Sequence, residues 1–216
     1  MAIETDSPSK TRFVALQSGI RLEAITVVWM TIEGALAIGS GVIAGSILLI
    51  AFGLDSVIEL ISGVLLLWRL SAEAHSNAVE RIEHAERRAT WLSAILLVLL
   101  CLYVTITIVV GLVWRIEPES SMPGILVSLG ALIIMPALAH LKRGVNTHLD
   151  SAALRADVAE SVTCAYMAGT VLSGLALNVA FGWWWAEYVA AAGFLYWLIG
   201  ETREAFEAAR GNADGE

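Results

Sequence analysis

Six long apolar runs dominate this sequence, and they constrain its fold more than any other feature. They cover residues 20–43, 45–68, 90–114, 124–140, 152–177 and 182–199. A helix needs about 20 predominantly apolar residues to span the hydrocarbon core of a bilayer. The chain is only 16% charged, whereas a soluble domain is about a quarter charged. The runs therefore predict an all-α integral membrane protein with six transmembrane helices.

The positions of the basic residues predict how these helices are oriented. Of the 13 Lys and Arg residues, only Arg115 falls on the side of the membrane opposite to the rest. Because cytoplasmic loops are enriched in Lys and Arg, both termini are expected in the cytoplasm. Residues 1–12 then form a cytoplasmic arm, 13–204 the membrane domain and 205–216 a short tail. The charged stretch that leads into this tail begins at Glu201, directly after the sixth run, and is interpreted as lying outside the membrane. The expected location is the cell membrane, or the inner membrane of a bacterium, as a multi-pass protein.

Charge and cysteine content exclude several other classes. The formal net charge is −8, and no basic run is long enough to follow a phosphate backbone, so a nucleic-acid partner is not expected. Both cysteines, Cys101 and Cys164, lie inside apolar runs, which gives no disulfide framework. The expected partners are the lipid bilayer, divalent metal ions and protons, for the reasons that follow.

Carboxylates inside the apolar runs are the second unusual feature. Placing one at the bilayer centre costs about 2.5–3.5 kcal/mol, and Lys142 is assigned to the loop after the fourth run, so no Lys or Arg is expected deep in a span. The acids must then face protein, water or a cation. Glu33 is either a proton-relay acid or a hydrogen-bond partner of a neighbouring helix. Three further acids lie near the expected membrane surfaces: Glu23, Asp157 and Glu187. Bonding across helices explains their presence at least as well as a functional role does.

The spacing of four residues suggests a metal site. Asp55 and Glu59 lie one helical turn apart on one face of the second run, and Glu160 and Cys164 have the same spacing in the fifth. Both pairs are expected near the middle of the membrane. Four such ligands suit the tetrahedral coordination of Zn²⁺, and a thiolate favours Zn²⁺ or Cd²⁺ over harder ions. A buried Cys164 that only packs is the alternative for that residue.

Two of these stretches resemble a known family. Residues 45–59, which contain Asp55 and Glu59, resemble the second transmembrane helix of cation diffusion facilitators. Residues 151–164 are similar to the fifth helix, where the family has His and Asp in place of Glu160 and Cys164. The resemblance implies a homodimeric, proton-coupled exporter with these four residues as metal ligands in each protomer. It also implies a short member, because residues 205–216 cannot form the family's C-terminal cytoplasmic domain.

The expected function is therefore efflux of Zn²⁺ or Cd²⁺ from the cytoplasm in exchange for protons, without an enzymatic reaction. The alternatives are an Fe²⁺ or Mn²⁺ exporter with the same site, a membrane-embedded metal enzyme and a helical scaffold without transport activity. An enzyme would need an open metal position and typically His ligands, but all four His residues lie at loops or helix ends. His75 and His84 stand in an acidic stretch that is either a cytoplasmic metal funnel or solvated surface.

Overall fold

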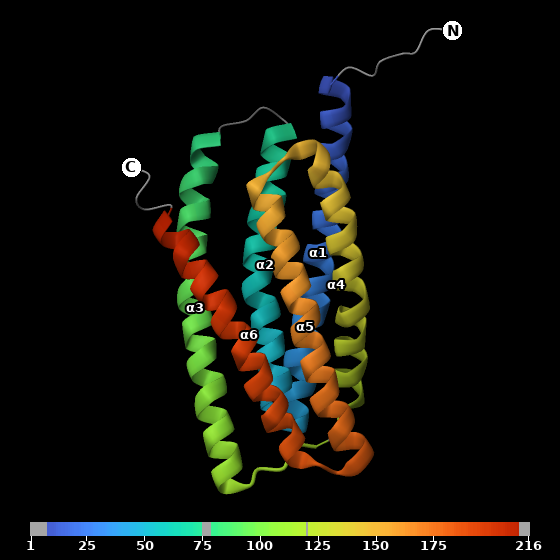
Figure 1. The fold of residues 1–216 in the computed structure, drawn as a ribbon, viewed down its shortest axis with the longest axis vertical. Helices are drawn as coiled ribbons and strands as arrows, with labels where there is room; N and C mark the ends of the chain where they lie inside the picture. The colour runs from blue at the N-terminus through green and yellow to red at the C-terminus, as the bar shows by residue number, and fades with distance from the viewer. Residues whose placement is uncertain (1–7, 75–78, 120, 212–216) are drawn as a thin grey trace, which may run out of the picture.

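Six α-helices form a single bundle in the computed structural model, which describes residues 8–74, 79–119 and 121–211. The helices are α1 (Pro8–Ala44), α2 (Ile47–Ala74), α3 (Val79–Trp114), α4 (Met122–Leu149), α5 (Ala152–Phe181) and α6 (Trp184–Gly211). Successive helices run in opposite directions, so α1 begins and α6 ends toward the same end of the bundle (Figure 1). The described residues contain no strand, and the predicted all-α fold is confirmed for them.

Five of the helices are long and apolar enough to cross a membrane. The qualifying segments are Arg12–Ala44, Ile47–Ala72, Ala94–Trp114, Met122–Leu149 and Ala153–Phe181. The segment α6 is not among them; it carries Glu187 and Glu201 and several Trp and Tyr side chains, which are less apolar than aliphatic ones. Large apolar side chains such as Ile43, Val113 and Ile133 are exposed on the outside of the bundle, as expected of a lipid-facing surface. The chain therefore has the features of a helical multi-pass membrane protein.

Three of the connections between helices are short turns. Gly45 separates α1 from α2 with a φ of 63°, and Gly182 ends α5 with a φ of 66°. Both values lie in the left-handed region, which glycine adopts without steric cost. Between α4 and α5, Asp150 is also left-handed, and the Ser151 hydroxyl accepts a hydrogen bond from the Leu154 amide to begin α5. The α4–α5 connection is therefore as tight as the two glycine turns.

Several helices extend well beyond the apolar runs that predicted them. The helices α1 and α3 begin before their runs, at Pro8 and Val79, so α1 starts inside the predicted arm of residues 1–12, and α4 and α6 continue past the ends of theirs. The predicted fourth span ended at residue 140, but α4 continues to Leu149. The predicted sixth span ended at residue 199, but α6 continues to Gly211. Backbone hydrogen bonds hold a helix whether its side chains are apolar or not, and α4 ends only where Asp150 becomes left-handed. The assignment of Lys142 to a loop was therefore wrong, and Glu201 lies within a helix instead of beginning a tail.

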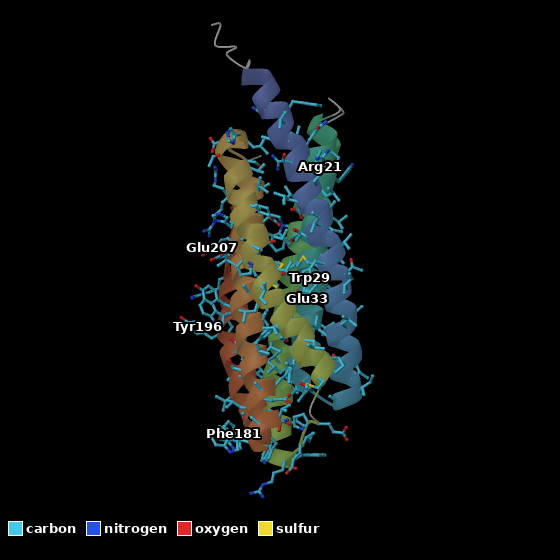
Figure 2. All side chains as sticks on the ribbon, turned by 90° about the vertical axis from the view of Figure 1, so that its right-hand side faces the viewer. Arg21, Trp29, Glu33, Phe181, Tyr196 and Glu207 are labelled. Carbon is cyan, nitrogen blue, oxygen red and sulfur yellow. The ribbon has the colours of Figure 1, made fainter. Side chains whose placement is uncertain are left out.

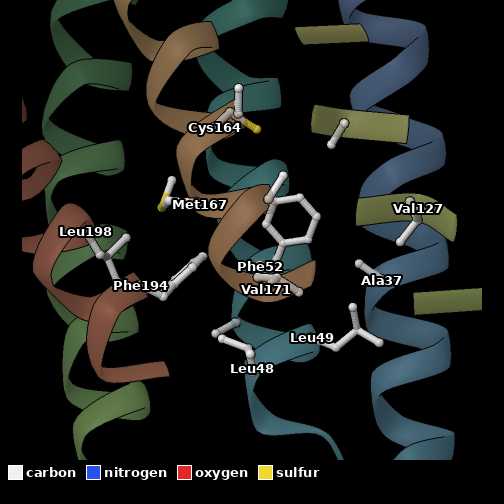
Figure 3. Close-up of a cluster of buried hydrophobic side chains, with 14 of the residues drawn as sticks. Ala37, Leu48, Leu49, Phe52, Val127, Cys164, Met167, Val171, Phe194 and Leu198 are labelled. Atoms are coloured by element: carbon white, nitrogen blue, oxygen red, sulfur yellow. The ribbon is translucent and has the colours of Figure 1, made fainter. Parts of the chain in front are cut away.

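The centre of the bundle is an apolar cluster to which all six helices contribute. The helix α2 packs against α1, α3, α5 and α6, so its side chains occupy the interior. Figure 3 shows Phe52 of α2 in this cluster with Val171 of α5 and Phe194 of α6. Because Phe194 and Leu198 are fully buried, α6 is an integral part of the bundle. This core surrounds the polar groups described below.

The closest approach of two helices occurs between α1 and α2. A methyl group added at Gly53 would lie 2.8 Å from the backbone nitrogen of Ile38 and 2.7 Å from its side chain. Only glycine allows two backbones to approach this closely. The contact brings α1 near the acidic face of α2, where the Ser56 hydroxyl reaches Glu33.

Candidate functional site

Two carboxylates of α2 are buried without a hydrogen-bond partner among the residues that the structure describes. Asp55 and Glu59 lie one turn apart on the inward face, and only 1% and 7% of their surfaces are exposed. Among the residues that the structure describes, none provides a hydrogen bond to any of the four carboxylate oxygens. A buried polar group without a partner is rare in native proteins, and a buried charge is more costly still. These two acids therefore require a cation, a proton or a ligand.

A third carboxylate reaches the same place from α6. Asp55, Glu59 and Glu201 each offer one oxygen, and the three atoms lie within 4.8 Å of one another. Glu201 is partly buried, and its Oε1 also lacks a hydrogen bond from the described residues. Sequence reasoning missed this residue because it was assigned to a charged tail. One signal was present: Glu201 follows the buried Glu187 by nearly four helical turns, which places both acids close to one face of α6.

Glu33 of α1, in contrast, has its hydrogen bonds satisfied. The Trp29 indole N–H donates to Glu33 Oε2 at 2.6 Å, and the Ser56 hydroxyl donates to Oε1 at 2.7 Å. The Cys164 thiol of α5 also donates to Oε1, at 3.7 Å. Figure 2 shows Trp29 and Glu33 about midway along the bundle. Glu33 therefore connects α1, α2 and α5, which agrees with the second of the two sequence-based alternatives, a hydrogen bond to a neighbouring helix.

The four predicted ligands are only partly brought together. Asp55 and Glu59 are adjacent, as their spacing required. Cys164 is buried on α5 with its sulfur bonded to Glu33, and Glu160 is one turn earlier and partly buried. The charges of Asp55 and Glu59 both act on Glu160, and those of Glu59 and Asp55 act on Cys164. Within the described ranges, however, neither α5 residue joins the group of carboxylates whose atoms lie within 4.8 Å.

A buried cation does exist in the bundle, contrary to the sequence-based expectation. Lys142 of α4 is fully buried, and its ammonium group lies 2.8 Å from Glu23 of α1 and 2.6 Å from Asp157 of α5. One positive and two negative charges leave this ion triad with a net charge of −1. Glu23 and Asp157 therefore bond across helices, which agrees with the first of the two explanations that the sequence left open for them. The triad also means that Lys142 is committed away from Asp55 and Glu59.

The remaining buried acid is satisfied at the opposite end of the bundle. Glu187 accepts hydrogen bonds from the Ser46 hydroxyl at 2.6 Å and from the Asn178 amide at 3.0 Å. Its oxygens are therefore both occupied, unlike those of Asp55 and Glu59. The cytoplasmic metal funnel considered for His75 and His84 stays a prediction, because His75 and the side chain of His84 lie outside the described residues.

The fold and its buried acids together define a class: a helical multi-pass membrane protein with ionisable groups along its interior. Comparison with protein-family models gives no match, and comparison with curated proteins gives none. The function must therefore be argued from the chain's own residues.

Proposed function

We propose that this protein is a divalent transition-metal cation transporter that exports its ion from the cytoplasm in exchange for protons. The observation that carries the proposal is the pair Asp55 and Glu59, whose four oxygens are buried and have no partner among the described residues. Ionisable residues inside membrane helices mark ion pathways and proton relays. A divalent cation bound between the two carboxylates would offset their burial.

The contrast with the other acids strengthens this argument. The ion triad, the hydrogen bonds of Glu33 and those of Glu187 each satisfy an acid with groups from the protein itself. Within the described residues, Asp55 and Glu59 have neither a hydrogen bond nor an ion pair on any of their four oxygens, so this pair depends on something that comes from outside. A permanent structural acid has no need of such an arrangement, whereas a transporter must leave its ligands available.

The proposed topology has six spans with both termini in the cytoplasm. The distribution of Lys and Arg supports it, and so does α6, which packs along α3 and α5 and buries Phe194 and Leu198 in the common core. The resemblance of residues 45–59 and 151–164 to cation diffusion facilitators supports the same class. The ligand set that the resemblance implies is Asp55, Glu59, Glu160 and Cys164, with Zn²⁺ or Cd²⁺ as the substrate, Fe²⁺ or Mn²⁺ as the alternative, and a homodimer as the assembly.

Proton exchange follows from the chemistry of such ligands. Carboxylates and thiols must lose their protons to coordinate a metal ion, so metal binding releases protons. Because several acids act on one another here, the protons belong to the cluster as a whole and not to one residue. A site that opens alternately to the two sides would carry metal one way and protons the other.

The test is a flux measurement in sealed proteoliposomes that contain a metal-sensitive dye and a pH-sensitive dye. Metal movement is expected to follow the pH gradient and to carry protons in the opposite direction. Asp55→Asn and Glu59→Gln are expected to abolish both signals, whereas Glu207→Gln, at an exposed acid of α6, is expected to keep them. Absence of flux for Zn²⁺, Cd²⁺, Fe²⁺ and Mn²⁺ would favour an enzyme or a scaffold. Flux that persists after the pH gradient collapses would indicate a passive channel.

A further inference from the structure

The donor atoms around Asp55 and Glu59 indicate which cation the site selects. We propose that Glu201 of α6 is a direct metal ligand, and that the resulting three-carboxylate site takes a hard divalent cation, Mn²⁺, in preference to Cd²⁺. This inference rests on the proposed function and adds to it a ligand from a third helix and the chemical class of the substrate. It moves the centre of the site from between α2 and α5 to between α2 and α6.

The geometry of the three acids supports a shared ion. One oxygen of each acid lies within 4.8 Å of the others, and ligand atoms around an ion held at about 2.1–2.3 Å would be separated by 3–4.5 Å. A small adjustment of the Glu201 side chain would therefore complete the coordination. Two helices supply the ligands: α2 provides an i, i+4 pair, and α6 provides the single acid that faces it.

An independent observation indicates that this cluster is more than a group of neighbouring acids. Asp55 and Glu59 are each more than nine-tenths buried, and their four oxygens have no hydrogen-bond donor in the described part of the chain. One oxygen of Glu201, Oε1, is likewise buried and has no hydrogen-bond donor in the described part of the chain. Five buried acceptor atoms without donors thus gather at one point inside an apolar bundle. Among the other buried acids that the structure describes, Glu33 and Glu187 have donors on both oxygens. The oxygens of Glu23 also lack a hydrogen bond from the described residues, but Glu23 is ion-paired with Lys142 at 2.8 Å.

Two thiols lie near the cluster in the described structure, Cys101 of α3 and Cys164 of α5, and each has a hydrogen-bond partner other than the three acids. The Cys101 sulfur lies 3.4 Å from the Thr202 hydroxyl. The Cys164 thiol donates its hydrogen bond to Glu33 Oε1 at 3.7 Å, and Glu33 is held in turn by Trp29 and Ser56. The additional group that α5 brings within electrostatic range is Glu160, another oxygen donor. Carboxylate ligands suit Mn²⁺, Mg²⁺ and Ca²⁺, whereas thiolates select softer ions. The donor set at the cluster is therefore a hard one.

The experiment measures Mn²⁺ binding to the purified full-length protein in detergent micelles. Free Mn²⁺ gives a six-line paramagnetic resonance signal that weakens on binding, so the signal reports affinity without any transport step. The variants are Glu201→Gln, the matched control Glu207→Gln on the exposed side of the same helix, and Cys164→Ser. Glu201→Gln is expected to weaken Mn²⁺ binding at least tenfold, and Glu207→Gln is expected to bind Mn²⁺ as the wild type does. Cys164→Ser tests whether any binding of Cd²⁺ depends on the thiol. Cd²⁺ is expected to displace Mn²⁺ only at a large excess.

The outcomes separate this inference from the proposed function. Wild-type Mn²⁺ affinity in Glu201→Gln would overturn the inference, as would tight Cd²⁺ binding that depends on Cys164 and not on Glu201; the exporter would still stand in both cases. If the wild-type protein neither binds nor moves any divalent ion, the proposed function itself fails. Should Glu201→Gln not fold, Glu201→Asp keeps the charge but shortens the reach by one methylene. Several-fold weaker Mn²⁺ binding is expected for it, and unchanged binding would overturn the inference.

Discussion

Replacing the buried lysine should destabilise this protein more than almost any other single change. Lys142 lies between Glu23 and Asp157, at 2.8 Å and 2.6 Å, with its side chain fully buried. Lys142→Met keeps most of the volume of the side chain but removes the only positive charge of the triad, so the local charge changes from −1 to −2. Breaking a buried ion pair by removing one partner costs about 3–5 kcal/mol. The unfolding equilibrium constant should therefore rise by roughly two to four powers of ten.

The measurement is unfolding in mixed micelles, followed by the fluorescence of the 8 tryptophans. Arg143→Met is the matched control, because it removes a neighbouring but exposed charge and should change the free energy of unfolding by less than about 1 kcal/mol. The triple variant Lys142→Met, Glu23→Gln, Asp157→Asn should recover most of the loss, since no charge is left uncompensated. If Lys142→Met unfolds at the wild-type midpoint, or if the triple variant is no more stable than the single one, the ion triad does not stabilise the fold.

Three further predictions use the same preparation. Gly53→Ala should destabilise the protein by about 1–3 kcal/mol, because the new methyl group would overlap Ile38; Gly39→Ala, whose methyl group would meet nothing within 4 Å, should cause no loss of stability. Ser46→Ala removes a hydrogen bond to buried Glu187 and should cost about 1.5–3 kcal/mol in the same unfolding assay. Native mass spectrometry of the purified protein is expected to detect a dimer, and a monomer at every concentration would contradict the proposed assembly.

The sequence predicted the helical class well because long apolar runs have few other solutions in a membrane. It predicted the helix ends poorly, since hydropathy records where a helix meets lipid and not where its backbone hydrogen bonds stop. The ends mattered here: both Lys142 and Glu201 lie in the stretches of α4 and α6 that extend beyond the apolar runs. A charged residue beyond an apolar run was interpreted as a loop or tail residue, although both helices continue through it into contact with the bundle.

The spacing of residues within one helix predicted correctly which side chains share a face. It did not predict which side chains of different helices meet. The i, i+4 relation put Asp55 and Glu59 on one inward face, as the structure has them. The rotation and tilt of α5 and α6 about their own axes depend on tertiary packing, which no local pattern encodes. That is why Cys164, placed by spacing with the α2 acids, has its hydrogen bond to Glu33, and why the approach of Glu201 was not predicted.

The ion triad also constrains how the nascent chain enters the membrane. Lys142 and Asp157 lie on either side of the tight connection at Asp150, so α4 and α5 carry a matched pair of opposite charges within one hairpin. Such a hairpin can leave the translocation channel as a neutral unit, whereas α4 alone would bring an unpaired ammonium group into lipid. Glu23 belongs to α1, which is synthesised first, and its carboxylate has no ion-pair partner until α4 brings Lys142 to it. A chain that ends before α4 would therefore leave the Glu23 carboxylate of α1 unpaired in the membrane, which is costly.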